Sequence, residues 1–103
     1  MSDQVEKAEK FKSLHKSRTF IIPNPWDSDS ARLLEGLGFQ ALATISAGFA
    51  QALGKLDGQV SLEEKLSHCC SITDATDIPL SADFENGFAD EPEQAAENVF
   101  LIA

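Results

Sequence analysis

The segment PLSADFENGF, residues 79–88, places two carboxylates two residues apart at the end of a short apolar stretch. Side chains alternate across a strand with a period of two, so a strand over residues 79–83 aims Ser81, Asp83 and Glu85 at the same face. Neighbouring anions repel each other unless a cation or an array of hydrogen-bond donors offsets their charge. The segment therefore predicts a strand ending in an acidic pair, and a metal site is the first functional hypothesis.

Two earlier segments also predict strands, over residues 20–22 and 41–45. Pro23 and Pro25 end the first of them. The segment AGFAQALGKLDGQV, residues 47–60, follows the second strand and contains three glycines without a strong hydrophobic period. It predicts a loop with at most a short helical turn, and loops after strands are places where functional sites are built.

Apolar residues at helical spacing predict four helices. They cover residues 3–16, about 28–37, about 61–75, and about 91 to the end of the sequence. Ser61 and Glu64 have the S-x-x-E spacing of a capping box at the start of the third helix, and Gly38 suits a left-handed end for the second. Pro92 fits the first turn of the last helix because its missing N–H is not needed there.

The caps and buried faces of these helices can also be predicted. Any of Ser28, Asp29 and Ser30 can cap the second helix, and residues 90–93 offer a second capping pattern before the last one. The apolar stripes expected to pack inward consist of Ala31, Leu34 and Leu37 on the second helix, and Leu62, Leu66, Cys69 and Thr73 on the third.

Strands that alternate with helices of ten or more residues indicate βαβ units, a parallel sheet and right-handed crossovers. The pattern predicts an α/β fold made of the first three βα units of a (β/α)₈ barrel, preceded by an N-terminal helix. Such a barrel normally needs at least about 200 residues. The 103 residues are thus interpreted as the N-terminal part of a single barrel domain, with the chain ending inside a helix.

Composition excludes several classes of function. The net charge is −9 and the eight Lys and Arg residues are scattered, which argues against nucleic-acid binding. No apolar run approaches the roughly 18 residues needed to cross a bilayer, and the charged N-terminus lacks the apolar core of a signal peptide, so no membrane partner and a cytoplasmic protein are expected. Cys69 and Cys70 are adjacent, which suits neither a disulfide framework nor a zinc site.

Four motifs occur in order along the chain: PNPWD at residues 23–27, SAG at 46–48, LGKLDG at 53–58 and DFENGF at 83–88. Together they resemble the isocitrate lyase and phosphoenolpyruvate mutase superfamily, especially its small lyase/mutase branch, from Phe11 onward. The resemblance implies a (β/α)₈ barrel that binds Mg²⁺, with Mn²⁺ as an alternative, and a 2-oxo acid or its enolate at the barrel mouth.

The resemblance also implies roles for particular residues. Asp83 would be the direct metal ligand, while Glu85 and Asp57 would act on the metal mainly through water. Ser46, Ala47 and Gly48 would contact the carboxylate or carbonyl oxygens of the substrate, and Asp57 and Ser46 are the candidate catalytic residues. We expect Ser46, Asp57, Asp83 and Glu85 to gather at one rim of the sheet.

The function implied is that of a Mg²⁺-dependent lyase or mutase. It would act on a small 2-oxo acid, a 2-hydroxy tricarboxylate or a phosphonate, and would make or break a C–C or P–C bond through a metal-stabilised enolate. The whole protein is expected to form a homo-oligomer.

Simpler readings exist for the same residues. Asp83 and Glu85 can serve only to solvate a turn, Asp57 can be a turn residue, Ser46 a helix cap and Asp27 a cap or an orienting partner. His15 and His68 are expected to have no role, and Cys69 to pack in the core. Two other functions are a truncated, non-catalytic half-barrel or interaction module, and a doubly wound Mg²⁺-binding domain, which would need about five strands.

Overall fold

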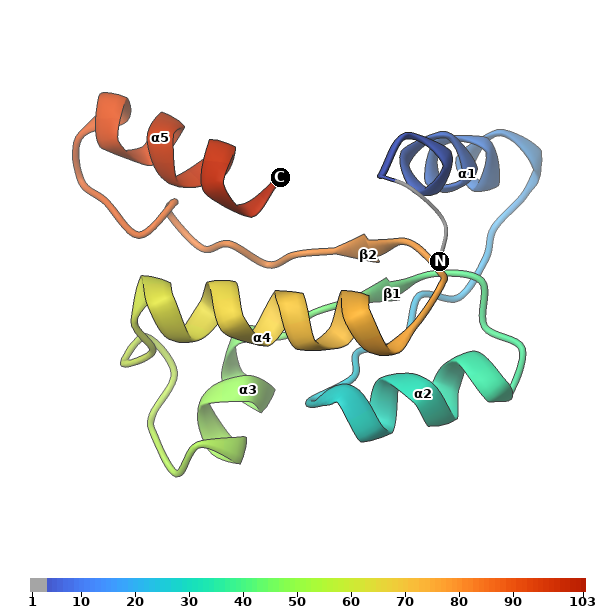
Figure 1. Cartoon of the computed structure of the whole chain (residues 1–103), viewed down its shortest axis with the longest axis horizontal. Helices are drawn as coiled ribbons and strands as arrows, with labels where there is room; N and C mark the ends of the chain where they lie inside the picture. The colour runs from blue at the N-terminus through green and yellow to red at the C-terminus, as the bar shows by residue number, and fades with distance from the viewer. Residues whose placement is uncertain (1–3) are drawn as a thin grey trace.

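The computed structural model describes residues 4–103 as five helices and a two-stranded parallel sheet. The helices are α1 (Gln4–Ser17), α2 (Ser28–Gly36), α3 (Ser46–Ala52), α4 (Leu62–Ala75) and α5 (Pro92–Ile102), and the strands are β1 (Leu42–Ala43) and β2 (Leu80–Ser81). In Figure 1, α1 and α5 lie above the strands, and α2 and α3 lie below them. The α/β class and the parallel pairing are those expected from the sequence.

The two strands are in register, with Leu42 opposite Leu80 and Ala43 opposite Ser81. The core lies between this sheet and the helices α2 and α4, which pack against each other, and α4 also contacts α5. Its buried members are Ala31, Leu42, Ile72 and Ile78, with Leu34 and Leu80 packed against them.

The strand predicted over residues 20–22 is not formed, so a third βα unit is not confirmed. Its segment nevertheless lies beside β1, because Ala43 N donates to Pro23 O over 3.0 Å. A parallel bridge would also need the N–H of residue 25 to donate back to Ala43 O, and Pro25 has no N–H. The side chain of Asn24 donates to Ala43 O instead, over 2.9 Å. A side-chain amide therefore replaces the missing backbone bond at this edge of β1.

The predicted helices all form, but some details differ. The segment predicted as a loop contains the seven-residue helix α3. Asp27 rather than residues 28–30 is the cap of α2, with Ser30 completing a reciprocal pair of bonds, and Glu91 precedes α5 without a side-chain cap. Leu37 is exposed, and the buried stripe of α4 consists of Lys65, His68, Cys69 and Ile72.

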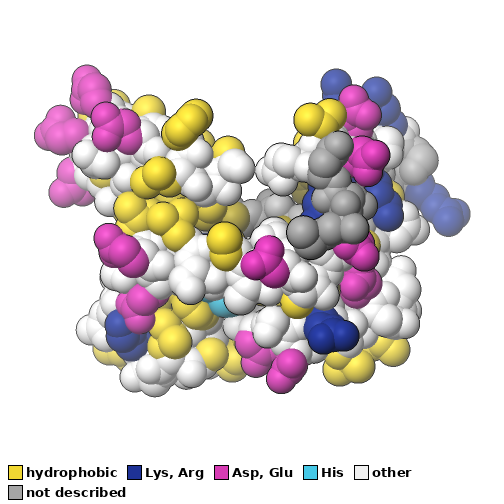
Figure 2. All heavy atoms as spheres, in the orientation of Figure 1, with side chains coloured by type: hydrophobic (Ala, Val, Ile, Leu, Met, Phe, Trp, Pro, Cys, Tyr) yellow, Lys and Arg dark blue, Asp and Glu magenta, His cyan; other side chains and the backbone are white. Residues whose placement is uncertain are grey.

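Other local predictions are confirmed. Ser61 and Glu64 form the capping box of α4, Gly38 has a φ of 100° after α2, and Pro92 lies in the first turn of α5. The side-chain colours of Figure 2 show Lys and Arg gathered around α1 at the upper right and Asp and Glu at the outer end of α5 at the upper left. None of the helices within residues 4–103 combines the length and the apolar character that crossing a membrane requires.

Candidate functional site

The acidic turn that follows β2 has an unusual backbone. Glu85 and Phe88 have positive φ values of 51° and 56°, and Gly87 has a φ of 80°. Residues other than glycine rarely adopt this conformation, and when they do the surrounding structure must hold them there. Here Asn98 of α5 is buried and its Nδ2 donates to Gly87 O over 2.8 Å. The turn is therefore clamped by α5, a condition often found where side chains must be aimed at a ligand.

Asp83 connects the ends of the two strands. Its backbone N–H donates to Thr44 Oγ1 over 2.7 Å, directly after β1. Its carboxylate accepts two longer bonds, from Ser46 N at 3.4 Å and from Glu85 N at 3.2 Å. These backbone donors offset part of the negative charge at the turn and leave carboxylate lone pairs free for another partner.

A narrow crevice, too tight in this structure to admit a water molecule, lies next to Ser46, to which this carboxylate is hydrogen-bonded. Ser46, Asp57 and Glu85 line it together with Lys65 and Phe88. The structure thus brings three of the four residues expected at one rim into one crevice, and the fourth, Asp83, is hydrogen-bonded to Ser46. Their roles as catalytic residues or ligands stay predictions.

Ala47 and Gly48 form the first turn of α3 with Ser46. Gly48 is buried, and a Cβ built on it would collide with the indole of Trp26 and lie 2.7 Å from Ile45 Cγ2. Close packing against Trp26 is thus sufficient to explain the glycine. Contact of Ala47 and Gly48 with a substrate stays a prediction.

Lys65 is the residue of this site that the sequence reasoning missed. Its side chain rises from α4 and is only 2% exposed, and Nζ donates to Thr44 Oγ1 over 3.0 Å. Burial lowers the pKa of Lys65, while the negative charges of Asp83 and Glu85 act in the opposite direction. The available signal was the polar pair Lys65 and His68 at helical spacing with Cys69 and Ile72, a stripe that periodicity alone could have identified.

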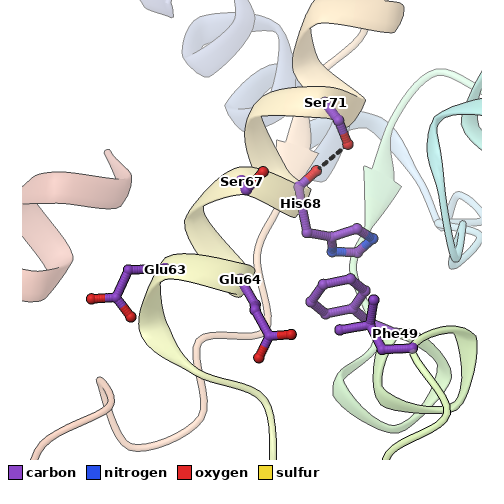
Figure 3. Close-up of a pocket in the computed structure, with 7 residues that line it drawn as sticks. Phe49, Glu63, Glu64, Ser67, His68 and Ser71 are labelled. Atoms are coloured by element: carbon purple, nitrogen blue, oxygen red, sulfur yellow. Dashed lines mark hydrogen bonds between the residues drawn. The ribbon is translucent and has the colours of Figure 1, made fainter.

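A larger hollow of about 440 Å³ lies between α3 and α4, away from the acidic turn. Figure 3 shows the ring of His68 lying against that of Phe49 in the wall of this hollow, with Glu63, Glu64, Ser67 and Ser71 along α4. The two rings are stacked, 3.6 Å apart and 6° from parallel. His68 Nε2 lies 2.9 Å from Trp26 O, which can only accept, so Nε2 carries the proton and the buried Nδ1 has no partner within the described residues. Burial lowers the pKa of His68.

The oxygen donors at the crevice suit a hard divalent cation. Mg²⁺ takes oxygen ligands, keeps several waters and needs only one or two protein carboxylates plus a substrate. Within residues 4–103, however, no three His, Cys, Asp or Glu residues lie together as a group that could hold a metal. The donor set therefore fits a cation held by Asp83 with water and a ligand, rather than one enclosed by this chain alone.

Comparisons with known proteins bear on the family and the fold of this chain. The family model described as phosphoenolpyruvate phosphomutase matches residues 11–103. A "putative lyase/mutase" from Burkholderia cenocepacia J2315 is similar to this chain with a TM-score of 0.93 and 46% identity, over 96% of this chain and 36% of that one. Oxaloacetate acetylhydrolase is similar with a TM-score of 0.81 and 29% identity, over 92% of this chain and 35% of its own.

A similar sequence also occurs in Mycobacterium tuberculosis (strain ATCC 25618 / H37Rv). This uncharacterised protein is 31% identical over 89 residues, which are 86% of this chain and 34% of that protein. The chain therefore spans about a third of the length of these relatives.

Proposed function

Because the chain belongs to the phosphoenolpyruvate phosphomutase family, within the phosphoenolpyruvate mutase/isocitrate lyase superfamily, we propose that it carries the metal-binding and part of the substrate-binding edge of a Mg²⁺-dependent lyase or mutase. The proposal includes the (β/α)₈ barrel, of which these residues would form the first part. The observation that carries it is the position of Asp83, which ties the ends of β1 and β2 together beside Ser46.

In this proposal Asp83 holds the cation, and Glu85 and Asp57 orient its water molecules from the walls of the crevice. Ser46 contacts a substrate oxygen, with Ala47 and Gly48 beside it at the start of α3. Mn²⁺ is expected to replace Mg²⁺, because both cations favour carboxylate and water ligands.

The substrate class follows from the chemistry of the relatives. Oxaloacetate acetylhydrolase is named for a 2-oxo acid, the family for a phosphomutase of phosphoenolpyruvate, and another similar structure is described as a "putative phosphonomutase". We therefore propose a small 2-oxo acid, a 2-hydroxy tricarboxylate or a phosphonate. Bound Mg²⁺ would supply the positive charge that stabilises an enolate when the C–C or P–C bond beside the oxo group breaks. A cytoplasmic homo-oligomer is part of the same proposal.

A second candidate is a non-catalytic half-barrel or interaction module. It is favoured by the apolar side chains exposed on α5, where Val99, Phe100 and Leu101 are 51%, 83% and 61% exposed. Such a surface is expected to lie against another chain or another part of the same protein.

The test is Mg²⁺ titration by calorimetry of the whole protein, of its Asp83→Asn variant and of Asp90→Asn. Asp90 is an exposed carboxylate seven positions further along and provides the matched change of charge. We expect Asp83→Asn to abolish measurable binding and the release of pyruvate, glyoxylate or oxalate from candidate substrates, and Asp90→Asn to preserve both. Mg²⁺ binding of undiminished affinity in Asp83→Asn would refute the metal assignment, and a whole protein that binds Mg²⁺ without turnover would favour the second candidate.

A further inference from the structure

Lys65 is a buried cation whose immediate contacts do not neutralise it. Removing an ammonium group from water is costly unless an anion or several acceptors replace the lost hydration. Lys65 Nζ donates a hydrogen bond to a neutral hydroxyl, that of Thr44, and lies 5.8 Å from the centre of the Phe49 ring. An ammonium has three N–H donors, so these contacts compensate it only in part.

Further compensation is available from the acidic turn, although among the described residues no carboxylate lies within ion-pairing distance of Lys65 Nζ. Thr44 Oγ1 accepts both from Lys65 Nζ and from Asp83 N, so a single oxygen atom joins the lysine to the backbone of the first carboxylate. Lys65 and Glu85 also line the same crevice, together with Asp57. Asp83 and Glu85 are among the negative charges that favour the charged form of Lys65, opposing its burial.

Lys65 is thus a second group, besides a metal ion, that can offset the repulsion between the carboxylates of Asp83 and Glu85. Two adjacent anions need a cation nearby, and the chain provides one on α4 in addition to any metal. Two cations that serve the same carboxylates also repel each other.

We propose that Lys65 is the internal counter-cation of Asp83 and Glu85 and that it opposes the binding of a divalent cation by this pair. The inference rests on the proposed Mg²⁺ site and deepens it. Before the metal cation binds, Lys65 offsets part of the negative charge of Asp83 and Glu85. Its positive charge then opposes the binding of the metal cation. An anionic substrate that enters with the metal would relieve this repulsion, so Lys65 favours the joint binding of metal and anion over binding of the metal alone.

The test compares the Mg²⁺ affinity of the whole protein with that of Lys65→Met, measured by calorimetry without substrate. Methionine has a similar length and no charge, and an apolar side chain is acceptable at a buried position. We expect Lys65→Met to bind Mg²⁺ about tenfold more tightly, because a unit positive charge near the metal has been removed from a site of low dielectric constant. Lys65→Gln keeps a hydrogen-bond donor for Thr44 and should also bind Mg²⁺ more tightly. It replaces Lys65→Met in the test if the methionine variant does not fold.

Two further variants distinguish the effect of the charge of Lys65 from its effect on the position of the acidic turn. Lys55→Met removes an equal charge from a partly exposed lysine that is ion-paired with Glu64 at 2.8 Å, and it should change the affinity by less than about twofold because solvent screens that charge. Thr44→Val removes the shared hydroxyl and keeps the ammonium, so it should not tighten binding. Far-UV circular dichroism checks that each variant is folded.

The outcomes distinguish this inference from the proposed function. Binding that is lost in Asp83→Asn but is unchanged or weakened in Lys65→Met and Lys65→Gln overturns the inference and leaves the metal site standing. Weakening by both Lys65→Met and Thr44→Val would show that Lys65 merely holds the turn in place. Absence of Mg²⁺ binding in the whole protein and in both Lys65 variants overturns the metal site itself, and the inference with it.

Discussion

Gly48 shows how closely single residues are packed beside the acidic crevice. It lies in α3 with Trp26 against its Cα, in a chain where most other glycines have open space around them. Glycine in a helix normally costs about 0.5–1 kcal/mol relative to alanine, so its presence here needs a reason. That reason is the indole ring, which leaves no room for a methyl group.

Gly48→Ala is expected to destabilise the protein by about 1–3 kcal/mol, because the new Cβ would force Trp26 and Ile45 apart. Gly36→Ala is the matched control, since Gly36 ends α2 and a Cβ added there would meet no atom within 4 Å. It should be neutral or stabilising by up to about 1 kcal/mol. Urea denaturation measures both, and equal stability of the two variants would contradict the packing described here.

His68 is a second residue whose environment sets a measurable property. Burial lowers its pKa below the usual value, so the folded protein resists protonation of the ring while the unfolded chain accepts a proton near pH 6.5. The unfolded state therefore binds more protons in this range, and the free energy of unfolding should fall as the pH drops from about 7 toward 5.

Urea denaturation at pH 7.5, 6.0 and 5.0 checks this expectation. His68→Phe can still stack on Phe49 but cannot titrate, so its stability should change less over the same interval. The pKa values of Asp27 and Glu64 are lowered in the folded protein, so these carboxylates also make the free energy of unfolding depend on pH. Their contribution is lost only as the pH falls below the usual pKa of a carboxyl group. An equally steep loss between pH 7 and 5 in His68→Phe would assign the effect to another group.

At the scale of elements, reciprocal caps determine where two of the helices begin. Ser61 Oγ accepts from Glu64 N over 3.1 Å, and Glu64 Oε1 accepts from Ser61 N over 3.0 Å. Glu64 also pairs with Lys55, so the cap holds the loop before α4 as well as the helix itself. Asp27 and Ser30 play the same part for α2.

Ser61→Ala should therefore lower the free energy of unfolding by about 1 kcal/mol, since the first turn of α4 loses its acceptor. Ser67→Ala removes an equal hydroxyl from an exposed position within the same helix and should be neutral or slightly stabilising. Urea denaturation compares the two. A Ser61→Ala variant as stable as Ser67→Ala would mean that the cap contributes nothing measurable.

At the scale of the whole molecule, the described chain leaves apolar surface and sheet edges uncovered. The sheet has two strands, so the outer edge of β2 is unpaired within residues 4–103. Hydrophobic side chains also lie open on α5, at the upper left in Figure 2. Both features favour association with further protein surface.

The 103-residue chain alone is expected to be inactive and to unfold with a free energy below about 5 kcal/mol, the lower limit for typical domains. It should also self-associate, and Phe100→Gln should raise its monomer fraction in sedimentation more than Leu37→Gln. Leu37 is the matched control because it is 68% exposed directly after α2, away from the Val99–Leu101 group. Substrate turnover by the short chain, or a monomer of ordinary stability, would contradict this expectation.

Local sequence determined most of the elements and the family. The starts and ends of α1, α2, α4 and α5 were predictable within a few residues, because caps, prolines and glycines act on hydrogen bonds only three or four positions away. The apolar segments around residues 42–43 and 80–81 also predicted their parallel pairing. Four short motifs in order were enough to indicate the superfamily.

Tertiary structure decided the chemistry of the site, since the partners there are distant in sequence. Lys65 meets Thr44 across 21 positions and His68 meets Trp26 across 42, so neither hydrogen-bond partner could be derived from the sequence of α4, although its periodicity indicates the face they lie on. Asn24 replaces the N–H that Pro25 lacks only because β1 lies beside it, and Glu85 keeps a positive φ because α5 clamps its turn. A buried charge or a strained backbone is tolerated only where distant groups compensate it, and only the folded chain brings those groups together.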